Sequence, residues 1–368
     1  MIKVLVFAKD LAWHGGVVNF ISQLKNNIDP AIYLHQFKIG QRRNALGKVF
    51  RPVTPLVDLI RLVLMLLVRK HDAYHVNPSF NFNSLIRDGL FLLVLRAFGK
   101  KNVIVTFHGW DSPVAENVAN SRVKLWLFNA AYSWTRCIMV LAEEFRVWMI
   151  EHGVAAEKVG VFTTMFDGTE FKSSRKTAHN HGYVVLYLSR IVKEKGVFEA
   201  ISAIEGLSKD FPDIKLVVAG TGPDEARARE FVRELGVEGA VEFLGYVRGE
   251  EKVDAFMAAD LFLLPSYGEG CPVSMMEAMA AGLPIVTTPV GGIPAIIKQD
   301  VNGILLDSVT NETVADAIRK FLKDYEYGEM ISNNNYKEAW EKYDARIITK
   351  IFERLYRGEC IRSVCGSC

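Results

Sequence analysis

Residues 265–282 read PSYGEGCPVSMMEAMAAG and follow the apolar run 260–264. The apolar run predicts a buried strand, and the Gly-rich stretch after it predicts a turn into a helix that begins near Pro272. Such a strand, loop and helix start presents free backbone N–H groups, which favour a phosphate. Glu269 precedes the expected helix and Glu277 lies inside it, so both carboxylates can accept hydrogen bonds from the hydroxyls of a sugar or a ribose.

The same alternation of short apolar, β-branched runs with longer helical patterns extends along the whole chain. This alternation is typical of parallel sheets with crossover helices, so it predicts an α/β fold. The expected strands fall in two series, which predict two Rossmann-like domains: 3–8, 73–76, 102–107 and 137–141 in the first, and 183–189, 215–219, 241–244, 261–265 and 284–287 in the second.

The length of 368 residues also exceeds one ordinary domain. Residues 1–170 carry 20 Lys/Arg against 13 Asp/Glu, and the remainder carries 24 against 29. The charge changes sign near the polar stretch GTEFKSSRKTAHNHG at 168–182, which has no hydrophobic period and reads as a linker. The expected organisation is a first domain at 1–170, a linker at 171–182, a second domain at 183–334, helices returning to the first domain at 335–357, and a flexible tail at 358–368.

Several classes of protein do not fit the composition. The longest apolar runs fall far short of the roughly 20 residues that cross a bilayer, so no spanning helix is expected. The first residues read as a buried strand and not as a secretory signal. Five cysteines form no disulfide framework in a chain of this length, which favours a reduced, cytoplasmic protein. Three of them (Cys360, Cys365 and Cys368) lack a fourth ligand, so a frayed terminus is favoured over a zinc site.

The segment 56–70, LVDLIRLVLMLLVRK, is apolar nearly all round a helix. It follows a stretch that contains no acid but five cations: Lys38, Arg42, Arg43, Lys48 and Arg51. One interpretation is a helix buried against the first sheet. The other is that the basic stretch and the apolar surface contact an anionic membrane or a lipid-linked substrate. The two interpretations can each hold in part.

The composite pattern E-G-x-P-x-x-x-x-E-A-M-A-x-G-x-P-I-V from Glu269, followed by Gly291 and Gly292, resembles the retaining, nucleotide-sugar-dependent glycosyltransferases of family 4. The resemblance covers the second half of the chain and reaches recognisable points in the first. It implies a GT-B fold, in which two Rossmann-like domains with parallel sheets face a central cleft and a C-terminal helix crosses back to the first domain.

The resemblance also implies roles for the residues of this loop. Glu277 matches the glutamate that binds the ribose of the nucleotide, and Glu269 matches the one that contacts the hydroxyls of the transferred sugar. Backbone amides of the intervening loop would meet the sugar and diphosphate. The loop's donor-binding residues are Gly270, Cys271, Pro272, Val273 and Ser274, of which Pro272 has no N–H to donate.

Upstream, the loop after the expected strand 183–189 holds three cations in six residues. Arg190 and Lys195 match the family's diphosphate-binding pair, and positioned cations can stabilise the charge of a departing nucleoside diphosphate without a metal. Gly222 lies in a Gly-rich turn that allows close backbone approach to a ligand. Val247, with Lys252, resembles the part of the family that lies near the nucleotide.

The first domain would supply the acceptor side. Gly15 and Gly16 resemble the family's flexible double-glycine loop near the donor phosphate and the acceptor. His108 ends an expected strand, where α/β sheets place their ligands, and matches the active-site histidine near the sugar, with Asp111 close by. The residue after His108 is glycine, where an acid is frequent in the family. Which acidic group assists the acceptor is therefore open.

Together these residues predict transfer of a glycosyl group with retention of configuration. The expected catalytic residues are His108, Glu269, Arg190 and Lys195; no covalent nucleophile, metal or cofactor is expected. The expected partners are a UDP-, GDP- or ADP-linked sugar, a saccharide or lipid-linked acceptor of lipopolysaccharide or exopolysaccharide assembly, and an anionic membrane surface on the cytoplasmic side, but no nucleic acid.

Two rival functions differ in class. An NAD-dependent oxidoreductase requires G-x-G-x-x-G after the first strand, and the loop KDLAWHGG at 9–16 does not provide it. A catalytically silent GT-B-like scaffold remains the alternative. The presence of all four of Glu269, Glu277, Arg190 and Lys195 argues against it, because a scaffold does not need them.

Overall fold

The computed structural model describes residues 1–13, 15–40, 54–171 and 182–359. The chain divides into two compact units: unit 1 is Met1–Thr163 together with Ala345–Cys368, and unit 2 is Thr164–Asp344. Among the described helices, none has the length and apolar composition needed to cross a bilayer.

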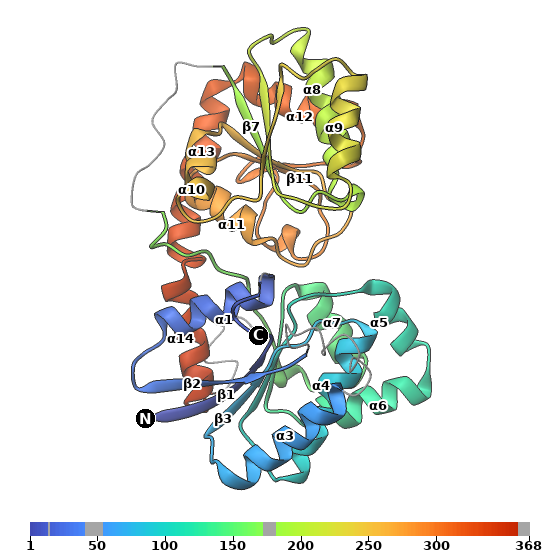
Figure 1. The fold of residues 1–368 in the computed structure, drawn as a ribbon, viewed down its shortest axis with the longest axis vertical. Helices are drawn as coiled ribbons and strands as arrows, with labels where there is room; N and C mark the ends of the chain where they lie inside the picture. Colours follow the sequence, from blue (N-terminus) through green and yellow to red (C-terminus); the bar gives the residue numbers. More distant parts are fainter. Residues whose placement is uncertain (14, 41–53, 172–181, 360–368) are drawn as a thin grey trace. The chain divides into compact units, whose positions relative to one another are not determined.

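Unit 1 is built on a parallel six-stranded sheet in the order β2-β1-β3-β4-β5-β6 (Figure 1). Helices α1 and α14 pack together, while α3, α4 and α6 form a second group in which α4 contacts both neighbours. The strands are β1 (Ile2–Ala8), β2 (Ile32–Lys38), β3 (Ala73–Val76), β4 (Val103–Thr106), β5 (Cys137–Val140) and β6 (Val159–Val161). The helices are α1 (Gly16–Asn27), α3 (Thr54–Val68), α4 (Phe82–Ala97), α5 (Ser112–Ala119), α6 (Arg122–Tyr132), α7 (Glu143–Glu151) and α14 (Ala345–Tyr356).

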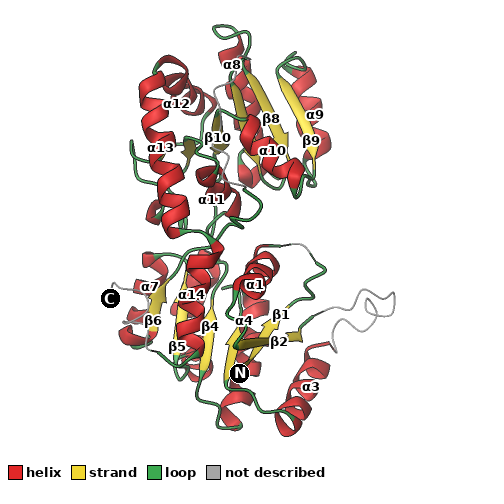
Figure 2. Ribbon diagram, turned by 90° about the vertical axis from the view of Figure 1, so that its left-hand side faces the viewer, coloured by secondary structure: helices red, strands yellow, loops and turns green. Residues whose placement is uncertain are grey.

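Unit 2 contains a second parallel six-stranded sheet, in the order β12-β11-β10-β7-β8-β9, with helices on both faces (Figure 2). One apolar core packs α8, α9 and α12 on the sheet, and another packs α10, α11 and α13. The strands are β7 (Val184–Leu188), β8 (Lys215–Ala219), β9 (Val241–Gly245), β10 (Leu261–Leu264), β11 (Ile285–Thr287) and β12 (Gly303–Leu305). The helices are α8 (Val197–Ser208), α9 (Glu225–Glu234), α10 (Glu250–Ala258), α11 (Val273–Ala280), α12 (Asn311–Lys323) and α13 (Tyr325–Lys342).

The predicted α/β architecture with two Rossmann-like parallel sheets is confirmed, and all nine expected strands are present. Three further strands, β2, β6 and β12, were not expected from the sequence. All three lie at the edge of a sheet. Strands β6 and β12 have only three residues each, and most side chains of β2 are exposed or half-buried. An edge strand is buried on fewer sides than a central one, so its sequence shows a weaker apolar signal.

The unit boundaries differ from the expected ones in two places. Residues 164–170 belong to unit 2 and not to the first domain. Residues 335–344 also stay in unit 2, because buried Asn335 donates to the carbonyls of Leu283 and Asn302 at 2.8 and 2.7 Å and fixes α13 there. The helix that belongs to unit 1 therefore begins at Ala345, not at 335. Residues 172–181 of the linker expected at 171–182, the basic stretch 41–53, and residues 360–368 of the tail expected at 358–368 lie outside the described residues.

The apolar helix expected at 56–70 is α3, and it is buried on one face only. Its buried residues are Asp58, Leu62 and Leu66, while Leu64 and Leu67 are exposed. The interpretation of a helix buried against the first sheet thus holds for one face, and the opposite apolar face is open to solvent.

Candidate active site

The Gly-rich loop of unit 2 lies at the carboxyl end of β10 and leads into α11, as the sequence predicts. Pro272 is the N-cap residue, with φ −71°, so the helix begins one residue after it. The conformation and packing of Gly291 explain why the Gly291–Gly292 pair of the pattern begins with a glycine. Its φ is +57°, and a Cβ atom there would stand 1.8 Å from the carbonyl oxygen of Glu269. The amide of Gly292 donates to the carbonyl of Gly270 at 2.6 Å, so this backbone contact holds the loop in place.

Lys195 and Glu269 form an ion pair at this loop. The Nζ atom of Lys195 lies 2.6 Å from Oε1 of Glu269 and donates to the carbonyl of Gly268 at 2.8 Å. Lys195 ends the short 3-10 helix Lys193–Lys195, and Gly196 after it packs so closely on the backbone of Pro265 that a Cβ atom would clash. The structure therefore brings together two residues that are 74 positions apart in the sequence and were both predicted to meet the donor.

Glu277 is buried in the middle of a charged cluster. Its Oε1 atom accepts a hydrogen bond from Nζ of Lys252 at 2.6 Å, and the same Nζ lies 2.8 Å from Oε2 of Glu170. Burial raises the pKa of Glu277, and Lys252 opposes this effect. Burial also disfavours the charge of Lys252, but the two carboxylates outweigh burial and raise the Lys252 pKa. Lys252 consequently stays charged and holds the Glu277 carboxylate in one orientation.

Sequence reasoning missed Glu170 and gave Lys252 only a secondary place. Glu170 was assigned to the end of the first domain, next to the expected linker. It lies in unit 2 and contacts Lys252, which is 82 residues away along the chain. No motif marks Glu170, because a contact between distant residues leaves no spacing in the sequence.

The remaining predicted donor-side residues of unit 2 include Arg190, Gly222, Val247 and Cys271. Arg190 is exposed in the turn after β7. A Cβ atom on Gly222 would stand 1.9 Å from the carbonyl oxygen of Ile191, so packing between two loops already requires a glycine there. Val247 and Cys271 are partly buried against the apolar core under α11. Packing accounts for these three positions, and their contact with a donor stays a prediction.

In unit 1, His108 follows β4, and its tautomer is fixed by Asn77. The side-chain nitrogen of Asn77 donates to the carbonyls of Phe7 and His75, so its oxygen faces Nε2 of His108 at 2.9 Å. Nε2 must therefore carry the proton, which leaves the lone pair on Nδ1. Burial lowers the His108 pKa to about 3. The ring is thus a neutral hydrogen-bonding group at physiological pH.

The three remaining predicted residues of unit 1, Gly15, Gly16 and Asp111, lie at the starts of helices. Gly15 and Gly16 are exposed at the first turn of α1, and Phe20 of this helix packs on His108 with ring centroids 4.7 Å apart. Asp111 is the N-cap of α5, where its Oδ1 atom accepts from the amide of Val114 at 3.3 Å. Asp111 therefore has a structural role that is sufficient to explain its presence.

The second half of the chain is similar in sequence to known glycosyltransferases. The sequence pattern of the family "Glycosyl transferases group 1" matches residues 169–338. The uncharacterized glycosyltransferase MJ1607 of Methanocaldococcus jannaschii is 33% identical over 174 residues, which are 47% of this chain and 44% of that protein. The putative colanic acid biosynthesis glycosyltransferase WcaL of Escherichia coli is 31% identical over 46% of this chain and 43% of its own length. The chain thus spans less than half the length of these relatives.

Solved structures match the fold over nearly the whole chain. Sucrose-phosphate synthase of Thermosynechococcus elongatus has a TM-score of 0.78 at 17% identity, covering 97% of this chain and 98% of that one. Anabaena HepE in complex with UDP-glucose has a TM-score of 0.74 at 17% identity, covering 98% and 100%. The chain therefore has the GT-B fold, and residues 169–338 match the sequence pattern of the group 1 glycosyl transferases.

Proposed function

We propose that the protein is a retaining glycosyltransferase of family 4, which moves a sugar from a nucleotide-diphosphate sugar to a saccharide acceptor. The Lys195–Glu269 pair on the α11 loop, with Glu277 buried eight residues later, carries the proposal. In this proposal Lys195 is the cation for the diphosphate, and Glu269 beside it is the carboxylate for the sugar. UDP is the first nucleotide to test, because HepE is described in complex with UDP and with UDP-glucose.

On unit 2, each group has a task set by its chemistry. Glu277 accepts hydrogen bonds from the ribose hydroxyls, and Lys252 keeps its carboxylate ionised and oriented. Glu269 accepts from hydroxyls of the transferred sugar. Lys195 and Arg190 hold the diphosphate, together with the free N–H groups at the start of α11. As the glycosidic bond breaks, negative charge grows on the departing phosphate, and these cations stabilise it more strongly than they stabilise the ground state.

On unit 1, His108 serves as a hydrogen-bond acceptor. Because Nε2 is occupied by Asn77, Nδ1 is the atom that can accept from a sugar hydroxyl. A pKa of about 3 prevents the ring from acting as a cation at neutral pH. Retention then follows from an ion-pair-like path on one face of the sugar, in which no side chain forms a covalent bond and no metal or cofactor takes part.

The acceptor is proposed to be a lipid-linked or cell-surface saccharide, of the kind used in lipopolysaccharide or exopolysaccharide assembly, and the protein to act at the cytoplasmic side of a membrane. WcaL is described as a putative enzyme of colanic acid biosynthesis, and a relative in Erwinia amylovora as an amylovoran biosynthesis glycosyltransferase. A polymer built at the cell surface is consistent with such an acceptor.

The test is a screen of the purified chain against UDP-, GDP- and ADP-linked sugars, in which donor hydrolysis and donor binding are measured separately. Lys195→Met and Glu277→Gln should each reduce kcat/KM at least 100-fold. Lys209→Met and Glu312→Gln, which alter exposed charges of unit 2, are the matched controls and should leave turnover unchanged. Unaltered turnover in Lys195→Met would contradict the assignment, and donor binding without turnover would favour a silent scaffold. The anomer released at early times, read by NMR, tests retention.

A further inference from the structure

One face of α3 exposes an apolar stripe along its whole length. Side chains at successive turns of the helix have exposed fractions between 44% and 81%. They are Leu56, Val57, Ile60, Leu64, Leu67 and Val68. An exposed apolar surface that runs along a helix is unusual in a soluble monomer and marks an interaction site.

The neighbouring helices continue this surface. On α4, Phe82, Ile86, Leu90 and Leu93 follow one another at helical spacing and are 39–52% exposed. On α6, Trp126 is 67% exposed. Because α3 packs on α4 and α4 packs on α6, these exposed side chains lie on adjoining helices of unit 1. We call the exposed apolar side chains of α3, α4 and α6 the apolar face.

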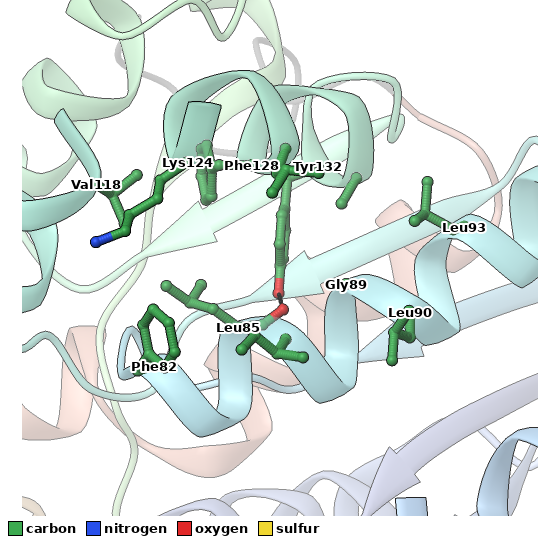
Figure 3. Close-up of a pocket in the computed structure, with 12 residues that line it drawn as sticks. Phe82, Leu85, Gly89, Leu90, Leu93, Val118, Lys124, Phe128 and Tyr132 are labelled. Carbon is green, nitrogen blue, oxygen red and sulfur yellow. Dashed lines mark hydrogen bonds between the residues drawn. The ribbon is translucent and has the colours of Figure 1, made fainter. Parts of the chain in front are cut away.

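A groove of about 230 Å³ opens in the apolar face between α4 and α6 (Figure 3). Leu85, Leu90 and Leu93 of α4 line one wall, and Phe128 and Tyr132 of α6 line the other. The Tyr132 hydroxyl donates to the carbonyl of Leu85 at 2.9 Å and is therefore satisfied within the wall. The groove exceeds the roughly 150 Å³ of a cavity that admits benzene, so it can admit part of a hydrocarbon chain.

In the segments that carry the apolar face, the exposed charges are all positive. Residues 54–70, 82–101 and 121–132, all of which the structure describes, contain two acids, Asp58 and Asp88. Both acids are buried and paired, with Arg61 at 2.8 Å and with Arg87 at 2.7 Å. The same segments hold seven further cations: Arg69, Lys70, Arg96, Lys100, Lys101, Arg122 and Lys124. If a second copy of this chain docked through the same face, these cations would repel one another, whereas an anionic lipid surface would attract them.

A basic recess adjoins the apolar face where α3 ends. It has a volume of about 460 Å³, and Val68 of the apolar stripe lines it together with Lys3, Arg69 and Lys70. Cations next to an apolar surface match the arrangement of phosphate head groups above the hydrocarbon of a bilayer.

We propose that the apolar face of α3, α4 and α6 docks on an anionic lipid bilayer, with one lipid hydrocarbon chain in the groove between α4 and α6 and head-group phosphates at the cations beside it. The inference deepens the proposed function, because a membrane-bound face would bring the protein to a lipid-linked acceptor. Docking itself requires neither donor nor acceptor.

The experiment measures co-sedimentation of the full chain with vesicles, without any sugar donor. We expect binding to phosphatidylcholine vesicles that contain about a third of phosphatidylglycerol, and weak binding to pure phosphatidylcholine. The double variant Leu64→Asn/Leu67→Asn should lower the partition coefficient at least tenfold, because two side chains no longer enter the hydrocarbon. Val301→Asn/Met330→Asn removes two comparably exposed apolar side chains from unit 2 and should bind as wild type.

Two further measurements locate the contact. Ile86→Asn/Leu90→Asn alters two side chains of α4 that line the groove and should also weaken binding tenfold or more. Trp126 fluorescence should be quenched by lipids brominated in their acyl chains, and the quenching should be absent in Trp126→Phe. Because these side chains are exposed, the variants should unfold at the wild-type temperature.

Three results would overturn the proposal. The first is binding that is equal on neutral and anionic vesicles and insensitive to salt. The second is equal partitioning of the α3 variant and the unit 2 control. The third is a dimer in solution that Leu64→Asn/Leu67→Asn converts to monomer, while vesicles bind neither form. Donor hydrolysis in solution is measured on the same preparations. If hydrolysis persists while vesicle binding fails, the docking proposal alone is wrong, whereas loss of hydrolysis with intact binding refutes only the proposed function.

Discussion

Replacing Lys252 by Met should destabilise unit 2 strongly, because it leaves the buried carboxylate of Glu277 without its cation. Removing one partner of a buried ion pair costs about 3–5 kcal/mol. The side chains of Lys252 and Glu277 are 18% and 8% exposed, so we expect the lower end of that range, about 3 kcal/mol. Glu170, whose side chain is 32% exposed, adds at most about 1 kcal/mol.

The loss should depend on pH with a definite sign. Burial raises the pKa of Glu277 and Lys252 lowers it, so the variant should have a still higher Glu277 pKa. A carboxyl group whose pKa is higher in the folded than in the unfolded state costs stability in full above the folded value; the cost declines as the pH falls below the folded value and is gone below the unfolded value. The deficit of Lys252→Met should therefore be larger at about pH 8 than at about pH 5.

Thermal unfolding followed by circular dichroism at both pH values measures the effect. For a unit of this size, about 3 kcal/mol corresponds to a fall in Tm of about 6–12 °C. The matched control is Lys342→Met, which removes an exposed ion pair with Glu338 on the same unit and should change stability by less than about 1 kcal/mol. Equal losses in the two variants, or a deficit of Lys252→Met that does not change with pH, would refute the reasoning.

Three other predictions follow from the packing and burial of individual residues. Gly291→Ala should cost about 1–3 kcal/mol and weaken nucleotide binding, as read by calorimetry, because the added Cβ meets the carbonyl of Glu269 at φ +57°. Burial lowers the pKa values of His108 and His75 to about 3, so neither ring should titrate by NMR between about pH 5 and pH 8. Unit 1 should lose stability in urea titrations as the pH falls below about 6.5, because only the unfolded state takes up protons there. Phe20→Ala should lower the free energy of unfolding by about 3–5 kcal/mol in the same titrations, because the ring is 2% exposed; a loss below about 1 kcal/mol would contradict the packing described.

The sequence predicts the interior of this fold better than its margins. Central strands such as β4 and β5 are buried along their full length, so apolar runs reveal them. The edge strand β2 carries Tyr33, His35 and Gln36 and gives no such signal. The α11 loop was predictable as well, since its glycines and acids stand close together in the sequence.

Contacts between distant residues were the part that the sequence could not supply. Glu170 reaches Lys252, and Asn77 sets the tautomer of His108, without any spacing that marks them. Asn335 was expected at the start of the helices that return to unit 1, but its two hydrogen bonds to buried carbonyls keep α13 in unit 2. The sequence does not distinguish a polar side chain that forms hydrogen bonds with buried backbone groups from one that is exposed to solvent.

Unit 2 interrupts unit 1 along the chain, and this order has a consequence for biosynthesis. Tyr356 of α14 bonds to His75 at 2.7 Å, and Phe352 packs on Phe20, so unit 1 completes its core only with the last described helix. A ribosome adds roughly 5–20 residues per second, so the strands of unit 1 must wait on the order of ten seconds or more for α14 while unit 2 is translated. A chain truncated before Ala345 would therefore hold all of unit 2 but lack the helix that completes the core of unit 1.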